Sequence, residues 1–385
     1  VELLPFKGIQ GLLPDENTAI IQWYIMEYGE KFCTFILTRQ SVQPIVWEST
    51  LKDLKDLQEW FLDYLAAYET QKDQWKKDLA DRLKRLAEIL HIEEIIGRLP
   101  KTCDQVILIP HRFLHLFPLH AIPLGGWPCL LDRFDRGVRY APSCQALLVS
   151  QNRKRPNFDQ LFAVGNPTQD LDYAEIEVQN ILHHFNPTRV LASQQATKQA
   201  LTVDCADYLY SSHCVHFSCH GTFESTSPLE SGLILAADNP LQLREIFSLD
   251  LRQCRLVTLS ACETGMTDFS SISDEYIGLP SGFLYAGSLS VVSSQWSVND
   301  LSTAFLLIRF YHNVCVKKLP VALALNQAQI WLRDVTNEEL QQWTSQLLLN
   351  PAQNIQLMLF YSTIPANSKP FESPYHWAAF CCIGQ

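Results

Sequence analysis

The chain has 385 residues, of which 47% are hydrophobic and 18% are charged, and its formal net charge is −11. This length fits two domains or one large domain. The negative charge disfavours direct nucleic-acid binding and suits basic partners. No run of about 18 apolar residues is present, so we expect no membrane-spanning helix. The 12 cysteines are irregularly spaced and no signal peptide is present, which favours reduced thiols in a cytoplasm.

Residues 1–155 are predicted to form an N-terminal domain. Two strand-like runs, Thr18–Tyr28 and Lys31–Thr38, indicate a hairpin. Residues 51–98 are dense in charged residues, and four leucines of this stretch share one helical face: Leu79, Leu83, Leu86 and Leu90. We expect an inserted amphipathic helical hairpin packed on its own domain, and a helix pair that binds a partner is the alternative. Because the chain begins at Val1, we also expect it to be a piece of a longer protein.

Three histidines follow the apolar run at 106–110, and their spacing suggests zinc: His111, His115 and His120. No acidic residue or cysteine joins them locally, and Pro118 interrupts any helix. We therefore expect a polar turn there, with no metal site and no other cofactor.

The basic stretch Arg153–Pro156 is the predicted linker between the two domains. Its ordinary interpretation is a solvated connector. The alternative is a self-cleavage site, because an acidic specificity pocket would accept its basic side chains.

Residues 156–385 alternate short apolar runs with helical patterns. Such alternation predicts an α/β fold, with a mostly parallel sheet flanked by helices and right-handed crossovers. The expected strands are Leu161–Gly165, Thr188–Leu191, two runs that end near His220 and Cys262, Gly232–Ala236, Leu289–Gln295 and Trp377–Ile383. The expected helices are Ala174–Phe185, Thr197–Tyr208, Gly278–Ala286, Asp300–Val314, Pro320–Asp334 and Glu338–Leu349.

Two of these runs end in residues suited to nucleophilic catalysis. Residues 214–221 read Cys-Val-His-Phe-Ser-Cys-His-Gly, and residues 256–265 read Leu-Val-Thr-Leu-Ser-Ala-Cys-Glu-Thr-Gly. If the two strands are neighbours, their carboxyl ends bring His220 and Cys262 side by side. Cysteine catalysis needs such an imidazole, because the thiolate is the attacking species and a free thiol is largely protonated at neutral pH. We therefore predict a His220–Cys262 dyad, against the alternative of a buried structural cysteine.

The proposed base has a rival in the same strand. His216 and His220 share one face of an extended strand, but His220 comes last and Gly221 frees the backbone to turn. We expect His216 to be a packed histidine. The backbone N–H groups of Gly221 and Cys262 are the predicted oxyanion hole.

The His-Gly and Ala-Cys pairs, each after an apolar run, resemble the caspase-like peptidases of clan CD, and the surrounding sequence resembles the CHAT family within that group. Six segments carry this resemblance: Val106–Pro123, Tyr140–Leu148, residues 214–221, Leu259–Gly265, Gly278–Asp300 and Ser373–Gly384. The resemblance implies a caspase-like fold with an active peptidase domain at 156–385. It implies that residues 1–155 form a degenerate, pseudo-protease domain, as in separase-like and CHAT proteins. It further implies upstream tetratricopeptide repeats and regulation by a partner protein.

The expected strand at 289–295 leads into a segment that we expect to bind substrate, because the corresponding strand of caspase-like enzymes pairs with an extended substrate. Its predicted contacts are Ser294, Gln295 and Trp296. The Trp-x-x-x-Asp spacing up to Asp300 resembles separases, where an acid in this region reads a basic P1 residue. We expect Asp300 to select Arg or Lys at P1, and a helix N-cap is its alternative role. The other acids that could serve are Glu263, which is also a predicted substrate contact, and Asp268, Asp274 and Glu275.

The sequence thus predicts a cytoplasmic cysteine endopeptidase that cleaves protein substrates after Arg or Lys. The alternative is a catalytically silent caspase-like scaffold for protein–protein interaction. A serine hydrolase is disfavoured because the chain has no Gly-x-Ser-x-Gly elbow. Residues 264–276 are expected to form a loop beside the nucleophile that a partner could order.

Overall fold

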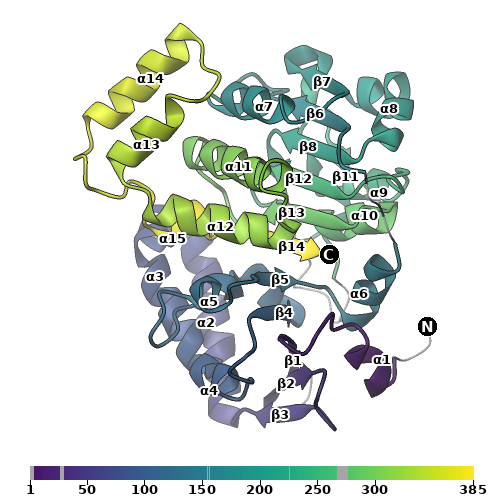
Figure 1. Cartoon of the computed structure of the whole chain (residues 1–385), viewed down its shortest axis with the longest axis vertical. Helices are drawn as coiled ribbons and strands as arrows, with labels where there is room; N and C mark the ends of the chain where they lie inside the picture. The colour runs from purple at the N-terminus through teal and green to yellow at the C-terminus, as the bar shows by residue number, and fades with distance from the viewer. Residues whose placement is uncertain (1–3, 27–29, 154, 156, 225, 267–275) are drawn as a thin grey trace. The chain divides into compact units, whose positions relative to one another are not determined.

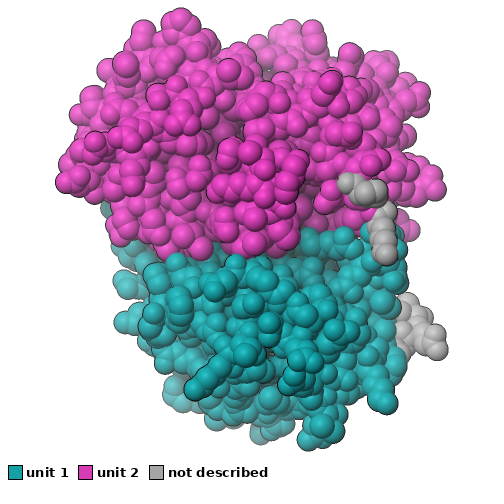
Figure 2. Space-filling model, in the orientation of Figure 1, with its two compact units in different colours: residues 1–154, 267–277, 381–385 teal, residues 155–266, 278–380 magenta. Residues whose placement is uncertain are grey.

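Strands and helices alternate through the computed structural model of the chain (Figure 1). The structure describes residues 4–26, 30–153, 155, 157–224, 226–266 and 276–385. It divides into two units, coloured separately in Figure 2: unit 1 holds residues 1–154, 267–277 and 381–385, and unit 2 holds residues 155–266 and 278–380. The α/β fold with mostly parallel strands agrees with the prediction.

The strands of unit 1 lie in the order β3-β2-β1-β4-β5-β14. Their bounds are β1 Thr18–Ile25, β2 Phe32–Thr38, β3 Ile45–Glu48, β4 Gln105–Ile109, β5 Val138–Tyr140 and β14 Phe380–Gly384. β1 and β2 pair antiparallel, with Ala19 opposite Thr38, which confirms the predicted hairpin. β4 pairs with β1 in parallel, and the buried residues of both strands account for their apolar runs.

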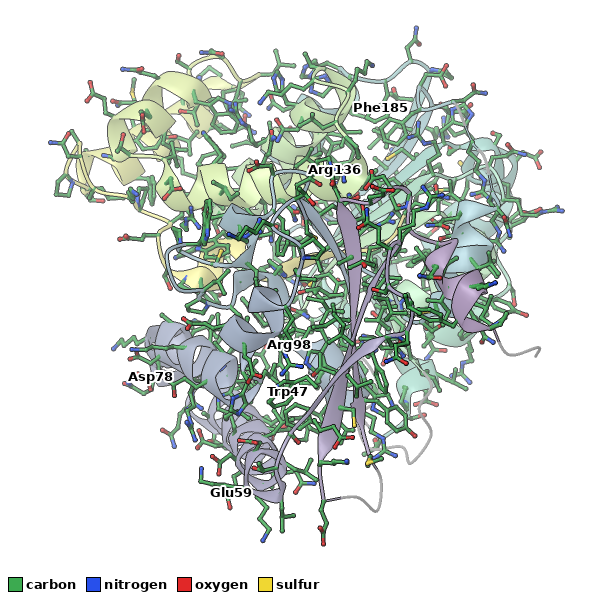
Figure 3. All side chains as sticks on the ribbon, turned by 60° about the horizontal axis from the view of Figure 1, so that its bottom comes forward. Trp47, Glu59, Asp78, Arg98, Arg136 and Phe185 are labelled. Atoms are coloured by element: carbon green, nitrogen blue, oxygen red, sulfur yellow. The ribbon has the colours of Figure 1, made fainter. Side chains whose placement is uncertain are left out.

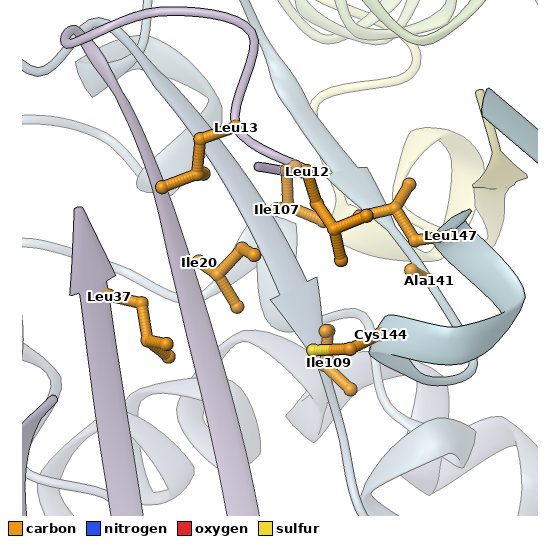
Figure 4. Packing of buried hydrophobic residues seen from close by; sticks show 9 residues of the cluster. All are labelled: Leu12, Leu13, Ile20, Leu37, Ile107, Ile109, Ala141, Cys144 and Leu147. Carbon is orange, nitrogen blue, oxygen red and sulfur yellow. The ribbon is translucent and has the colours of Figure 1, made fainter. Parts of the chain in front are cut away.

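One hydrophobic cluster of unit 1 packs strands of the sheet against the segment before β1 and the segment after β5 (Figure 4). It includes residues of β1, β2 and β4 and of the short helix α6 (Cys144–Gln151), and α1 (Phe6–Gln10) supplies two partly buried side chains. Its buried members are Leu12, Leu13, Ile20, Leu37, Ile107, Ile109, Ala141, Cys144 and Leu147. Full burial of one Leu or Ile side chain is worth about 1.5–3 kcal/mol, so this cluster is a substantial part of the core of the unit.

The charged stretch at 51–98 forms three helices, α2 (Leu51–Thr70), α3 (Lys72–Ile89) and α4 (Ile92–Gly97). Thr50 and Asp53 form a capping box that starts α2. The four predicted leucines of α3 and its end are each 1% exposed or less, and α3 packs against α2. Glu59 and Asp78 lie on the outer side of the pair (Figure 3). The amphipathic hairpin therefore uses its apolar face within its own unit.

The large sheet of unit 2 has the order β13-β12-β8-β6-β7. Its strands are β6 Leu161–Gly165, β7 Thr188–Ala192, β8 Cys214–Ser218, β12 Leu256–Ser260 and β13 Ser290–Ser294. Neighbouring strands are all parallel, and β6, β8, β12 and β13 are buried along their whole length. A small second sheet has the order β11-β10-β9, with β9 Gly221–Thr222, β10 Gly232–Leu233 and β11 Leu241–Gln242. The parallel order brings the carboxyl ends of β12 and β8 to one edge.

The helices of unit 2 are α7 Ala174–Leu182, α8 Ala206–Ser211, α9 Leu243–Ile246, α10 Leu279–Ala286, α11 Asp300–Cys315, α12 Val321–Asp334, α13 Asn337–Thr344, α14 Pro351–Ser362 and α15 Pro374–Trp377. α11 packs between α7 and α12 (Figure 1). Four predictions were wrong in detail. The expected strand at 232–236 is only two residues long, Trp377 ends a helix rather than starting a strand, and α14 was missed. The expected helix at 197–208 is instead a π-helical segment, Ala200–Asp204, followed by α8.

The predicted linker is described only in part, because Lys154 and Pro156 lie outside the described residues. The guanidinium of Arg155 donates to the carbonyl oxygens of Cys254, Gly287 (2.6 Å) and Leu251 (3.4 Å). Arg155 is therefore bound to unit 2, and self-cleavage at this stretch stays a prediction. No helix in the described part of the chain is both long and apolar enough to cross a membrane.

Candidate active site

His220 and Cys262 follow two adjacent strands at matching positions. β8 and β12 are parallel neighbours in which Ser218 lies opposite Ser260, and the backbone N–H of Cys219 donates to Ser260 O (3.2 Å). The adjacency predicted from the sequence is thus confirmed. Each strand ends two residues before its proposed catalytic residue, so His220 lies just beyond β8 rather than in it.

Cys262 differs from most other cysteines in its exposure. Nine of the 12 cysteines are buried, and only Cys205, Cys262 and Cys315 are partly exposed. Burial raises the pKa of Cys144 to about 11 and that of Cys315 to about 12, so these thiols stay protonated at neutral pH. The hydroxyl of Ser297 donates to Cys262 Sγ at 3.6 Å. Cys262 is therefore one of few sulfur atoms in the chain that a substrate can reach.

His220 is held by a carboxylate that sequence reasoning missed. Its Nε2 donates to Asp170 Oδ1 at 2.9 Å, and the side chain of His220 is 36% exposed. Asp170 lies in the loop after β6, the strand next to β8. A hydrogen bond from Thr168 and one from His220 lower the pKa of the Asp170 carboxyl, so it is ionised at neutral pH. A carboxylate in this position orients the ring and leaves Nδ1 for proton transfer.

His216, the rival base, is fully buried. Its Nε2 lies 2.8 Å from Glu177 Oε1, without the alignment of a hydrogen bond, and its Nδ1 lies 3.3 Å from the hydroxyl of Tyr311. That hydroxyl donates to Thr258 (2.9 Å), and Glu177 also accepts from Ser260 Oγ (3.0 Å). The network places His216 beneath the sheet edge and away from solvent.

We expect Glu177→Ala to lower the free energy of unfolding by about 3–5 kcal/mol, because it leaves a buried imidazole and the Ser260 hydroxyl without their carboxylate. Urea unfolding followed by circular dichroism measures this loss. Glu175→Ala, which removes an exposed carboxylate from the same helix, is the control. A loss below 1 kcal/mol for Glu177→Ala would contradict a supporting role for the network.

The backbone of Gly221 lies close to that of Cys262, and the oxyanion hole proposed at these two residues stays a prediction. A Cβ on Gly221 would lie 2.7 Å from Cys262 O and 2.8 Å from Thr264 Cγ2, so only glycine permits this close approach. Within the described residues, the N–H of Cys262 donates to no acceptor. Glu263, the next residue, has a positive φ of 58°, a conformation that costs free energy and recurs at functional sites.

The predicted substrate contacts at the end of β13 and just after it are close to the turn that carries Cys262 but have buried side chains. Ser294 Oγ donates to Ala261 O (2.5 Å), and the N–H of Glu263 donates to Trp296 O (3.3 Å). Trp296 is 1% exposed and donates through Nε1 to Tyr375 O (3.1 Å). The side chain of Gln295 is also buried, and its N–H donates to Ala379 O (2.9 Å). These residues support the turn that carries Cys262.

Asp300 is the first residue of α11, and Asn299 is the residue that caps this helix, through a bond from the N–H of Ser302. The Asp300 carboxylate instead accepts from the N–H of Tyr173 (2.9 Å) at the start of α7. Burial raises the pKa of Asp300 to about 6. The alternative acids Asp268, Asp274 and Glu275 lie outside the described residues.

A cavity of about 420 Å³ is lined in part by the loop that leads to Asp170. Thr168 and Gln169, in this loop, line one side of the cavity. Residues 235–237 also line it, and they come directly after Ile234, whose N–H donates to His220 O (2.9 Å). Gln169 and Ala237, both in its lining, have positive φ values of 63°. Strained backbone on both walls is consistent with a binding surface.

This fold and site define the class of the protein: a mostly parallel sheet flanked by helices, with a histidine and a cysteine beyond adjacent strand ends, is the caspase-like fold of cysteine peptidases. A family model of the CHAT domain matches residues 79–385, and the chain belongs to this family. No curated protein is similar enough in sequence to match it.

Solved structures with the same fold include two of the Saccharomyces cerevisiae separase–securin complex. One has a TM-score of 0.59 at 11% identity and covers 98% of this chain, and the other has a TM-score of 0.54 at 10% identity and covers 83%. The chain spans 30% and 29% of the length of those two chains. A structure of the Arg-specific cysteine proteinase gingipain R has a TM-score of 0.48 at 8% identity. The match covers 79% of this chain and 67% of the gingipain chain.

Proposed function

We propose that the chain is a cysteine endopeptidase in which His220 and Cys262 form the catalytic dyad and Asp170 orients His220. The observation that supports the proposal is the register of β8 and β12, two parallel neighbours that each end two residues before His220 and Cys262. Membership of the CHAT family and the likeness of the fold to separase support it.

The reaction follows from these groups. His220 takes the thiol proton of Cys262, and the thiolate attacks the carbonyl carbon of a peptide bond. The N–H groups of Gly221 and Cys262 hold the oxyanion, and each such donor is worth about 3–4 kcal/mol. The tetrahedral intermediate collapses as His220 returns its proton to the leaving amine. Water then attacks the thioester with His220 as base, which releases the acid product and restores the thiol.

We propose Asp300 as the acid that selects Arg or Lys at P1. Its carboxylate is half-buried and ionises near pH 6, and no ion pair with a basic residue neutralises it among the residues that the structure describes. A basic P1 side chain would supply the missing counter-charge. Ser294, Gln295, Trp296 and Glu263 would then frame the substrate through the turn that they support.

The cavity lined by Thr168 and Gln169 is suited to the substrate residue after the scissile bond, because the adjacent Asp170 holds His220, the residue that would protonate the leaving amine. Its lining offers amide, hydroxyl and apolar groups but no described charged side chain: Pro167, Thr168, Gln169, Gln194, Leu235, Ala236 and Ala237. Peptides extended beyond P1 should therefore be cleaved faster with a neutral than with a charged residue at this position. Equal cleavage rates for peptides with a neutral and with a charged residue after the scissile bond would contradict the assignment of this cavity.

A protein partner is part of the proposal. The separase structures are complexes with securin, and this chain, whose net charge is −11, suits a basic partner or a basic substrate segment. Upstream tetratricopeptide repeats and a cytoplasmic location remain predictions from the sequence.

A fluorogenic peptide panel with Arg, Lys, Asp or Leu at P1 tests the function. We expect cleavage after Arg and Lys. A preference for Asp would overturn the acidic pocket. Absence of cleavage together with full partner binding by Cys262→Ala would favour the catalytically silent scaffold.

A further inference from the structure

A second cavity of unit 2, of about 380 Å³, lies where the ends of α7 and α11 meet the segment after α13. No Asp or Glu lines it among the described residues. Its lining residues are Asn180, His183, His184, Ile308, Arg309, His312, Trp343, Gln346, Leu347 and Leu348. A cavity of this size accommodates a small organic molecule.

Arg309 gives the cavity a positive charge without a counter-charge. Its guanidinium lies 5.0 Å from the ring centre of Trp331, and no carboxylate pairs with it in the part of the chain that the structure describes. Burial lowers the pKa of Arg309, which reflects the cost of keeping this cation partly away from water. An unpaired cation in a cavity is notable in a chain whose net charge is −11.

Three imidazoles surround the same space. The rings of His183 and His184 are 3.9 Å apart, and those of His184 and His312 are 6.2 Å apart. Burial, and then the neighbouring histidines, lower the pKa of His184 to about 4. Burial and then Arg309 lower the pKa of His312. Among the described residues, the charged and titratable groups that act on the rings of His184 and His312 are all basic: His183, His184, His312, Arg309, Lys317 and Lys318.

We propose that this cavity binds the anionic group of a small organic molecule, a phosphate or a carboxylate, as an effector. The anion would pair with Arg309 and accept from the imidazoles. Trp343 and Leu347 would contact the apolar part of the molecule, since Trp343 is only partly buried by Phe305 and Trp331. A bound anion relieves the mutual repulsion of the basic groups, so it favours protonated histidines and binds more tightly as the pH falls.

The effector role follows from the two helices that carry the site. α7 and α11 pack against each other, and Phe185 just after α7 (Figure 3) packs edge-on against Tyr311 of α11 at 5.9 Å. The first turns of the same helices hold Glu177, which contacts His216 and Ser260 of the two central strands, and the bond between Asp300 and Tyr173. An occupant at the far ends of both helices is therefore in a position to bias the site. This regulatory part rests on the proposed peptidase function, whereas the binding part does not.

The binding test uses sulfate and benzoate, whose charges stay constant between pH 6 and 8, each titrated at fixed ionic strength. We follow the histidine ring protons by NMR and the unfolding temperature. We expect saturable shifts of the ring protons of His184 and His312, with a higher affinity at pH 6 than at pH 8. Sulfate represents a phosphate group and benzoate a carboxylate with an apolar body, so the better ligand identifies the class.

Two variants of Arg309 and one control variant decide the outcome. Arg309→Gln should lose saturable binding and Arg309→Lys should retain part of it, whereas Arg189→Gln, which removes an exposed arginine elsewhere, should bind as the wild type does. Equal binding by Arg309→Gln and wild type, or no saturable binding at either pH, would overturn the site. Saturable binding that leaves kcat/KM of an active wild type unchanged would overturn the effector role.

Discussion

Replacing Cys262 with alanine is expected to lower peptide cleavage at least 1000-fold and to leave the unfolding temperature nearly unchanged. The loss is large because no other group replaces the attacking sulfur once the thiol is gone. The stability should change little because the thiol is partly exposed and has only a weak hydrogen bond, 3.6 Å from Ser297. Cleavage of an Arg-P1 peptide and differential scanning fluorimetry give the two values.

Cys205→Ala is the matched control, since Cys205 is also partly exposed but lies outside the site. It should keep the full rate. Cleavage by Cys262→Ala at a rate near that of the wild type would refute the nucleophile. A large fall in its unfolding temperature would show instead that Cys262 is structural.

Replacing Asp300 with asparagine is expected to lower kcat/KM for an Arg-P1 peptide by about 100-fold, because loss of one partner of a buried charge pair costs about 2–5 kcal/mol. Asparagine keeps an oxygen to accept from the N–H of Tyr173, so the start of α7 should stay in place. A Leu-P1 peptide should lose much less. Steady-state kinetics with both peptides separates loss of charge from loss of structure.

The pH dependence of peptide cleavage is a second test of the role of Asp300 in P1 selection. Burial favours its neutral form and raises its pKa to about 6, so the carboxylate that would bind Arg forms only as the pH rises through that value. The ratio of kcat/KM for Arg over Leu should therefore rise between pH 5 and pH 7 in the wild type. It should stay flat in Asp300→Asn. Asp204→Asn, which removes an exposed acid that does not act on Asp300, is the control.

An unchanged Arg-to-Leu ratio in Asp300→Asn would assign the specificity to another acid. Glu263 would then be the first to test, because it follows Cys262 directly.

The sequence was sufficient to predict most of unit 2, because its central strands are short apolar runs with clear ends. The predicted strand at 161–165 has the observed bounds, and the His-Gly and Ala-Cys runs are parallel neighbours. A short, continuous apolar run is typical of a parallel strand that is buried on both faces, so the local sequence alone was enough to predict these strands. The helical hairpin at 51–98 was equally clear from its leucine spacing.

The missed features depend on contacts between distant segments. Asp170 is 50 residues from His220 in sequence, and the two come together because β6 lies beside β8. Examination of the acidic residues that follow the strand next to β8 would have identified Asp170. α14 did carry a local signal, because Asn350 and Gln353 form a capping box around Pro351 at its start. The contact of Asp300 with Tyr173 had no signal in either segment alone.

The most direct measurement of the central claim is covalent capture with a peptidyl-arginine chloromethyl ketone, followed by peptide mass spectrometry. The dyad predicts one adduct per chain, on Cys262, that forms much more slowly in His220→Ala. The two other partly exposed thiols, Cys205 and Cys315, should remain free. Reaction of Cys262 at the rate of these two thiols, or its indifference to the loss of the His220 imidazole, would contradict the catalytic dyad.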